Sequence, residues 1–221
     1  MRVISWEEYT AVNSEQVTGN MNCTLSLTVG VFDGVHRGHQ ALIQRICKPY
    51  PASLSHPENQ NSDPRCSLLP VPCSLIPTVV TFRQNPLRVL RPDAFTGDIM
   101  NLEEKLHFLE VLGVQLTVLI DFSAEFSKIS GRGFIDLLLC RPVTLIALGQ
   151  NFRCGYQLDT GAEEIRNLAG ERGLDYWIAP PVMDEGRPVS SSRIRQALAA
   201  GQKAEAERLL GWPLELANKS S

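Results

Sequence analysis

The stretch Gly30-Val-Phe-Asp-Gly-Val-His-Arg-Gly-His39 joins two segments of different periodicity. It leaves an apolar run, Leu25 to Phe32, that is typical of a buried β-strand. It then enters a segment in which Leu42, Ile43 and Ile46 recur on one face of a helix. The stretch therefore predicts a strand, a tight turn and a helix in direct succession.

The same alternation continues along the chain. Four more short apolar runs are typical of buried strands, at 78–82, 116–121, 143–148 and 174–179. The clearest helix between them begins at Asn101, where Asn101 and Glu104 have the spacing of a capping box, and Gly113 provides its stop. Two more helices are expected at 193–200 and 203–210, with Gly201 between them.

Strands that alternate with helices favour parallel pairing through right-handed crossovers. We therefore predict an α/β fold with a Rossmann-like, doubly wound parallel sheet of about five strands, in a single domain over residues 1–221. Such a sheet binds ligands at the carboxyl ends of its strands. The stretch at 30–39 leaves the first of the predicted strands at such an end.

Residues 48–77 interrupt this alternation. They contain half of the chain's 14 prolines, many Ser and Asn residues and no glycine. Because no apolar period is sustained there, the segment is expected to be an irregular insertion in the domain. Two roles remain open for it, a tolerated surface loop and a lid over a binding site.

Composition excludes several classes of protein. The 21 basic and 24 acidic residues give a formal charge of −3, which provides no general attraction to nucleic acid or to an anionic membrane. The chain has no apolar stretch of about 18 residues and no secretory signal, so we expect a cytoplasmic protein. Six cysteines without a CxxC pair are expected to be reduced thiols, and no obligate protein partner is indicated.

The quoted stretch has the features of an anion site. Gly34 permits backbone angles that a side chain would forbid, and Gly38 lets a phosphate approach the free N–H groups of the first helical turn. His36 and His39, three residues apart, are expected on one side of the helix start, aimed at the same ligand. Two surface histidines are the plain alternative. A zinc site would lack ligands, because Asp33 is the only close candidate.

The stretch GVFDGVHRGHQALI resembles the HxGH signature of nucleotidyltransferases in the form found in prokaryotic FAD synthetases. This resemblance implies transfer of AMP from ATP to FMN with release of pyrophosphate. It implies that His36 and His39 are catalytic donors to the α-phosphate and the bridging oxygen. It places the nucleotide at Gly30, Phe32, Asp33 and Gly38. Mg²⁺ is expected to be held by phosphates and water, with no protein ligand to the metal.

Two further motifs carry the resemblance. Val189-Ser-Ser-Ser-Arg-Ile-Arg195 resembles the family's SSTRIR motif, which implies phosphate binding by Ser191, Ser192 and Arg195 and a catalytic role for Arg193. Read without the resemblance, it is a capped helix with two guanidiniums on its first turn. Gly149-Gln-Asn-Phe-Arg-Cys-Gly155 resembles the family's G-x-[DN]-F-x-F-G element, which implies that Gly149 and Asn151 bind the nucleotide. A glycine-bounded turn is the alternative.

The resemblance covers most of residues 25–213 outside the insertion, with one departure that bears on substrate recognition. Where the family reads TFDPHP, this chain has Thr81-Phe-Arg-Gln-Asn-Pro86, so an acid and a histidine are missing. Phe82, Asn85 and Phe152 are the flavin-binding residues that we expect. Eight residues follow Pro213, so the riboflavin kinase domain of bifunctional relatives is expected to be absent and FMN to come from elsewhere.

Two other functions remain open from the sequence. One is another HxGH nucleotidyltransferase, such as a cytidylyltransferase or a pantetheine-phosphate adenylyltransferase. The other is a protein that binds a flavin or a nucleotide without catalysis. The altered TFRQNP stretch favours the binding protein, whereas the intact histidine pair and the SSSRIR stretch favour the enzyme.

Overall fold

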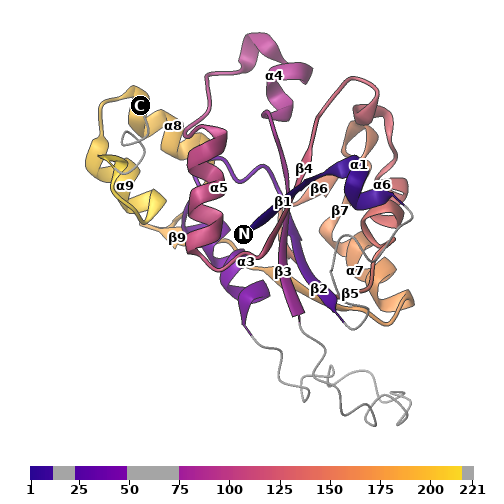
Figure 1. The fold of residues 1–221 in the computed structure, drawn as a ribbon. Coiled ribbons are helices and arrows are strands. Elements are labelled where there is room, and N and C mark those ends of the chain that lie inside the picture. Colours follow the sequence, from indigo (N-terminus) through magenta and orange to yellow (C-terminus); the bar gives the residue numbers. More distant parts are fainter. Residues whose placement is uncertain (12–22, 49–74, 216–221) are drawn as a thin grey trace.

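The computed structural model describes residues 1–11, 23–48 and 75–215 (Figure 1). Its centre is a six-stranded sheet with the order β1-β4-β3-β2-β5-β8. The strands are β1 (Arg2–Ser5), β2 (Thr24–Val29), β3 (Leu75–Phe82), β4 (Leu116–Ile120), β5 (Val143–Gly149) and β8 (Asp175–Ala179). All the pairs in this sheet are parallel. The predicted α/β fold with a doubly wound parallel sheet is confirmed.

One strand of the central sheet was not expected from the sequence. β1 has four residues, lies at the edge of the sheet beside β4, and has only Ile4 buried. A half-exposed edge strand of this length has too few apolar positions to produce a period, so it appears only when Arg2 to Ser5 pair with 116–119.

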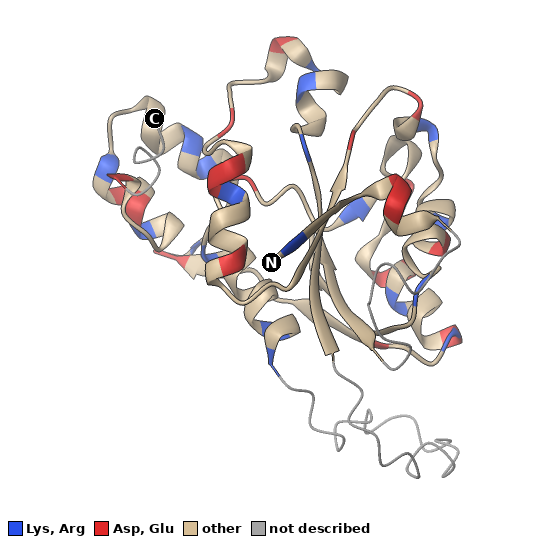
Figure 2. Cartoon of the chain, in the orientation of Figure 1, with Lys and Arg blue, Asp and Glu red and all other residues tan. Residues whose placement is uncertain are grey.

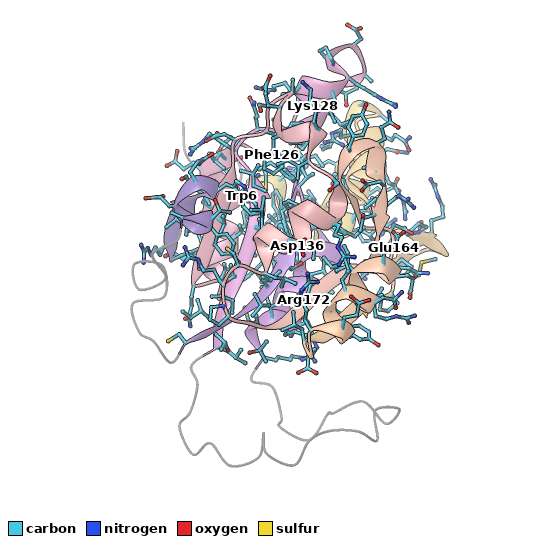
Figure 3. The ribbon with its side chains drawn as sticks, turned by 90° about the vertical axis from the view of Figure 1, so that its right-hand side faces the viewer. Trp6, Phe126, Lys128, Asp136, Glu164 and Arg172 are labelled. Carbon is cyan, nitrogen blue, oxygen red and sulfur yellow. The ribbon has the colours of Figure 1, made fainter. Side chains whose placement is uncertain are left out.

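Helices cover both faces of the sheet (Figure 1). One face carries α3 (Arg37–Cys47), α5 (Leu102–Val111), α8 (Ser191–Ala199) and α9 (Lys203–Leu210). The other carries α1 (Trp6–Thr10), α6 (Gly131–Leu138) and α7 (Ala162–Glu171). Each layer has its own apolar core. On the second face, Trp6 stacks on Phe134 at 5.5 Å and meets the edge of Phe126 at 6.0 Å between ring centres (Figure 3).

The ends of α5 show why its residues form a helix there. Asn101 Oδ1 accepts from the N–H of Glu104 at 2.9 Å, and Glu104 Oε2 accepts from the N–H of Asn101 at 2.8 Å. This reciprocal pair is the predicted capping box. The helix stops before Gly113, whose φ of +95° is accessible mainly to glycine. The predicted bounds of this helix are therefore confirmed at both ends.

Short elements complete the chain and surround the carboxyl ends of the strands. They are α4 (Pro86–Leu90), η2 (Pro92–Ala94), η3 (Phe126–Lys128), β6 (Arg153–Cys154), η4 (Tyr156–Leu158), β7 (Thr160–Gly161), β9 (Met183–Asp184) and β10 (Arg187–Pro188). β6 pairs with β7, and β9 with β10, as two small antiparallel ribbons.

Most of the segment predicted as an insertion, 49–74, lies outside the described residues. Its last three residues belong to β3, which begins at Leu75. Pro77 pairs with Ser26 of β2, and its carbonyl accepts from the N–H of Gln115 at 2.9 Å. The strand thus starts before the predicted end of the insertion, because proline is tolerated near the start of a strand.

Charged side chains are mixed over the outer surface. In Figure 2 the central strands are almost entirely tan, and acidic and basic residues are interspersed on the outer helices. Any attraction for a phosphate must therefore arise from local groups.

Among the helices in the described part of the chain, none combines the length and the apolar character needed to cross a membrane.

Candidate active site

The turn between β2 and α3 has an unusual backbone. The predicted strand was to reach Phe32, but β2 ends at Val29, so this boundary was wrong. Phe32 has φ of +53° and Val35 has φ of +36°, and neither can continue a strand. A positive φ at a β-branched or bulky residue is strained and persists only where the surroundings enforce it. The sequence marks only Gly34, with φ of +83°, for such a conformation.

The surroundings hold this turn by its carbonyl groups. Side chains from four other parts of the chain donate to them: Thr81 Oγ1 to Val31 O at 3.0 Å, Ser191 Oγ to Asp33 O at 2.9 Å, Trp212 Nε1 to Gly34 O at 3.1 Å and Gln40 Nε2 to Val35 O at 2.9 Å. Because a peptide N–H points opposite to its carbonyl, the N–H groups of Phe32 and Gly34 point away from these donors. No backbone carbonyl in the described residues accepts from either N–H. The turn can therefore offer both to an anion.

The two histidines meet at the start of α3. His36 is the N-cap, its Nδ1 accepts from the N–H of His39 at 3.4 Å, and the two rings stack with centres 3.6 Å apart. Since Nδ1 of His36 is an acceptor, the proton of the neutral ring lies on Nε2. The ring of His39 also packs against Phe32 at 4.9 Å. The spacing of three residues thus brings the imidazoles together, as expected.

Burial keeps both imidazoles neutral at pH 7. It lowers the pKa of His36 to about 4. The pKa of His39 lies well below its usual value because of burial first, and then because of His36 and Lys105. Nδ1 of His39 is buried and has no hydrogen-bond partner among the described residues. An unpaired buried nitrogen is unfavourable unless a ligand satisfies it.

The Asp33 side chain is committed to the protein. Its Oδ1 accepts from the N–H of Ile99 at 2.8 Å, and its Oδ2 forms an ion pair with Arg195. Burial raises the pKa of the Asp33 carboxyl, and the hydrogen bond from Ile99 and the charge of Arg195 oppose that effect. Both carboxylate oxygens of Asp33 thus have protein partners, and only backbone groups beside this residue can bind a ligand. The nucleotide-binding role of Asp33 stays a prediction.

The guanidiniums of Arg193 and Arg195 point to different partners. Arg193 is buried and binds Asp184 Oδ2 at 3.1 Å and Glu205 Oε1 at 2.9 Å. Arg195 binds Asp33 and the carbonyl of Gly97. The two guanidiniums of the first turns of α8 therefore face different partners, because residues two apart on a helix do not face each other.

The hydroxyl groups of the same motif also have separate positions. Ser190 caps α8 by accepting from the N–H of Arg193 at 3.2 Å, Ser191 donates to Asp33, and Ser192 is exposed. The phosphate-binding roles of Ser191, Ser192 and Arg195 and the catalytic role of Arg193 stay predictions. What the structure adds is that Ser191 and Arg195 both contact Asp33 in the turn.

The third motif lies at the end of β5. A Cβ added to Gly149 would meet nothing within 4 Å, and Asn151 is exposed, so space for a ligand exists beside both. Gly155 differs, because its φ is +85° and a Cβ there would collide with the backbone of Gly131. The backbone of Gly155 therefore packs closely against the start of α6. Phe152 is half-buried and packs against the core. The binding roles predicted for these residues are not tested.

A pocket lies on the β3 side of the turn. It is a small, open hollow with a cavity volume of about 30 Å³, lined by Val31, Asp33, Arg83, Asn85, Asp98, Met100, Leu102 and Lys105. Asn85 caps α4 and donates from Nδ2 to Asp98 Oδ1 at 3.2 Å. Phe82 meets the edge of Phe122 at 5.7 Å between ring centres. Arg83 pairs with Asp121 at 2.7 Å, an exposed ion pair that a ligand can displace at little cost.

Sequence reasoning missed Asp98 and Lys105, which line the pocket beside Arg83 and Asn85. The only signal was a lysine, Lys105, at a helix position that faces the core. In the part of the chain that the structure describes, no group of three or more His, Cys, Asp or Glu residues could hold a metal ion.

Comparisons with known proteins agree on one family. A family model described as FAD synthetase matches residues 19–53 and 73–193. A bifunctional riboflavin kinase/FMN adenylyltransferase of Escherichia coli K12 is 31% identical over 195 residues, which are 87% of this chain and 56% of that protein. A FAD synthetase of Listeria monocytogenes is 26% identical over 189 residues, covering 85% of this chain and 68% of that protein.

A solved structure supports the same fold. The crystal structure of a macrolide-efflux protein from Streptococcus pneumoniae aligns with a TM-score of 0.69 and 29% identity, over 97% of this chain and 63% of that one. The chain spans about half the length of the bifunctional relatives, at 56% of the Escherichia coli protein. With the family model matching well over half of its residues, the chain belongs to the FAD synthetase family.

Proposed function

We propose that the protein transfers the AMP group of ATP to FMN, forming FAD and pyrophosphate. The observation that carries this proposal is the turn after β2, whose carbonyls are held by other side chains while two stacked histidines begin α3. An N-terminal helix turn with free N–H groups favours phosphate. Relatives named for FMN adenylylation supply the reaction type.

In this mechanism the phosphate of FMN attacks the α-phosphorus of ATP directly. The bond from the α-phosphorus to the bridging oxygen breaks, and pyrophosphate leaves with that oxygen. The protein supplies position and charge stabilisation rather than a nucleophile. The neutral His36 donates through Nε2, and His39 stacked on it donates to the same phosphate oxygens, where negative charge grows in the transition state.

The remaining groups fall on either side of the turn. We assign Gly149 and Asn151, at the end of β5, and Ser191, Ser192 and Arg195, on α8, to the nucleotide. Toward β3, the pocket that contains Arg83 and Asn85 receives the flavin phosphate, with Phe82 and Phe152 near the flavin ring. This division follows the topology, because β2 lies between β3 and β5 and the strand order reverses there.

Mg²⁺ is part of the proposal as a companion of ATP. Since the described residues offer no metal cluster, we assign its ligands to phosphate oxygens and water. Bound there, the ion would neutralise charge on the triphosphate. A cytoplasmic location belongs to the same proposal, because that is where ATP is supplied to biosynthetic enzymes.

The test is direct. Purified protein is incubated with ATP, Mg²⁺ and FMN, and flavins are separated by chromatography while pyrophosphate is measured in the same sample. FAD and pyrophosphate in equal amounts are expected. Parallel samples replace ATP with CTP, or FMN with phosphopantetheine. Product in one of those samples but not with FMN would show a different nucleotidyltransferase, and binding of FMN without any product would show a binding protein.

A further inference from the structure

We propose that Lys105 is a positioning residue that holds the nucleotide-binding turn and the flavin-side segment at a fixed separation, so that the two substrates meet at the α-phosphate. This inference rests on the proposed function for its catalytic consequence. Its structural part concerns only this chain and is tested separately below.

The inference begins where β2 and β3 separate. Their last paired residues are Val29 and Val80, and the ladder closes with the N–H of Gly30 donating to Val80 O at 3.1 Å. Beyond this point Val31 enters the strained turn, and β3 runs on to Phe82 and the Arg83–Asn85 segment that lines the pocket. We call the opening between Val31 and Phe82 the strand fork.

Lys105 bridges the strand fork from α5. Its Nζ donates to Phe82 O at 2.8 Å, to Val31 O at 3.3 Å and to Thr81 Oγ1 at 3.4 Å. Thr81 Oγ1 in turn donates to Val31 O at 3.0 Å. The ammonium group of Lys105 thus contacts the carbonyl of Val31, at the start of the turn, and the carbonyl of Phe82, just before the Arg83–Asn85 segment.

These contacts argue against a role as a direct phosphate ligand. An ammonium group has three N–H donors, and Lys105 has three protein acceptors for them. No N–H remains for a substrate without breaking one of these bonds. The residue therefore acts on the substrates through the backbone that it holds.

A purely structural role explains the residue poorly. Lys105 is 7% exposed, and no carboxylate oxygen of the described residues lies within 4.0 Å of its Nζ. An unpaired buried cation is costly, and an apolar residue would fill the same helix position more favourably. Burial lowers the pKa of Lys105 to about 8, and Asp33 and Asp98 oppose that effect. His39 and Arg83 are the other charged or titratable groups near it.

The experiment compares Lys105→Met, which keeps the length and apolar stem, with Lys128→Met. Lys128 is an exposed lysine of η3 (Figure 3) that does not line the pocket, and it serves as the matched control. In the FMN adenylylation assay we expect Lys105→Met to lower kcat by about tenfold to a hundredfold, because displacement of reacting groups by about 1 Å has effects of that size. KM for either substrate should change less than threefold. Met removes a buried charge but leaves the Val31 and Phe82 carbonyls without this donor, so the two effects on stability oppose each other and the melting temperature should change little. The control should match the unaltered protein.

A second variant keeps the test independent of how Lys105→Met folds. Thr81→Val retains shape, removes the other donor to Val31 and removes an acceptor of Lys105. It should lower kcat severalfold, and the double variant should lose less than the product of the two single losses, because both residues act on one carbonyl. Unchanged kcat in both single variants would overturn the proposal, as would a loss fully explained by unfolding.

Amide hydrogen exchange separates this proposal from the proposed function. In Lys105→Met without substrates, the hydrogen-bonded amides of Gly30, Val35 and Arg83 should exchange at least tenfold faster than in the unaltered protein, while those of β5 do not change. We expect this faster exchange even if the protein does not form FAD. A failure to form FAD would contradict the proposed function but not the positioning role of Lys105. Equal exchange at the strand fork in both proteins would refute the positioning role, whatever the activity.

Discussion

For single residues, the burial of His36 and His39 is compatible with the donor roles that we propose for them. A neutral imidazole keeps one N–H donor, so lowering its pKa does not remove its ability to stabilise a phosphate oxygen. The stacked pair places two such donors at one point, because His36 caps the helix on which His39 sits. The same burial that excludes water also strengthens each donor toward charge that develops in the transition state.

The first prediction concerns turnover. His39→Ala should lower kcat by roughly a hundredfold to a thousandfold, the usual effect of losing one donor to a developing oxyanion, or about 3 to 4 kcal/mol in the barrier. His36→Asn should act in the same direction while it preserves the helix cap. Steady-state rates and urea unfolding on the same samples separate catalysis from folding. Near-normal turnover in both variants would contradict the assigned roles.

The second prediction concerns acid stability. The folded pKa of His36, about 4, is below the unfolded value of about 6.5, so the unfolded chain binds more protons between these values. Stability is therefore fully present above pH 6.5 and falls as the pH drops toward 4, by at most roughly 3 kcal/mol from this residue. The free energy of unfolding measured from pH 7 to pH 4 should decline less steeply in His36→Asn. Parallel curves for the two proteins would show that His36 is not buried as a neutral ring.

At the scale of elements, the site depends on helices that are distant in sequence. α5 supplies Lys105 to the turn, α8 supplies Ser191, and the residues after α9 supply Trp212. Each reaches one carbonyl of the turn. A backbone held in positive φ at Phe32 and Val35 needs such constraints, because strain of about 1 to 3 kcal/mol per residue would otherwise relax.

The third prediction tests one of these constraints. Trp212→Phe removes the indole N–H that donates to Gly34 O at 3.1 Å but keeps an aromatic ring against Phe108. We expect a loss of about 1 to 3 kcal/mol in stability, since a buried carbonyl loses its partner. We also expect turnover per folded molecule to fall, because the turn is less constrained. Thermal unfolding gives the first quantity, and kcat normalised to bound ATP gives the second. An unchanged kcat would show that the turn does not need this donor.

At the scale of the whole molecule, the strand order puts the turn after β2 between the ends of β3 and β5. Two separate cores, one on each face, stabilise the sheet.

The fourth prediction concerns residues 49–74, which lie in the segment that sustains no apolar period in the sequence. Replacing residues 49–74 by a short flexible linker, with Leu75 retained as the start of β3, should leave the domain folded with a similar melting temperature. The closure entropy of a loop changes only with the logarithm of its length, about 0.6 kcal/mol for each doubling. Circular dichroism and thermal unfolding provide the measurement, and FMN turnover of the same variant shows whether the segment acts on the substrates. Global unfolding would place the segment in the core.

The sequence by itself determined the elements that depend on local patterns. α9 spans Lys203–Leu210 as predicted, α5 begins at its capping box, and β4 matches its apolar run to within one residue. These features follow from periodicity and capping within about ten residues. The strand, turn and helix around 30–39 could equally be predicted from the sequence. The closeness of His36 and His39 could be predicted too, because residues three positions apart at the start of a helix lie on the same side.

Only the tertiary structure decided which distant residues meet at the turn. The contacts of Asp33 with Arg195, of Gly34 with Trp212 and of Val31 with Lys105 join residues between 74 and 178 positions apart. Such contacts depend on how the crossovers stack the helices, which no local pattern encodes. The partners of Arg193 and Arg195 and the positive φ of Phe32 were hidden for the same reason. The contacts of these residues are made with partners in other parts of the fold. Those partners become neighbours only when the helices pack on the sheet.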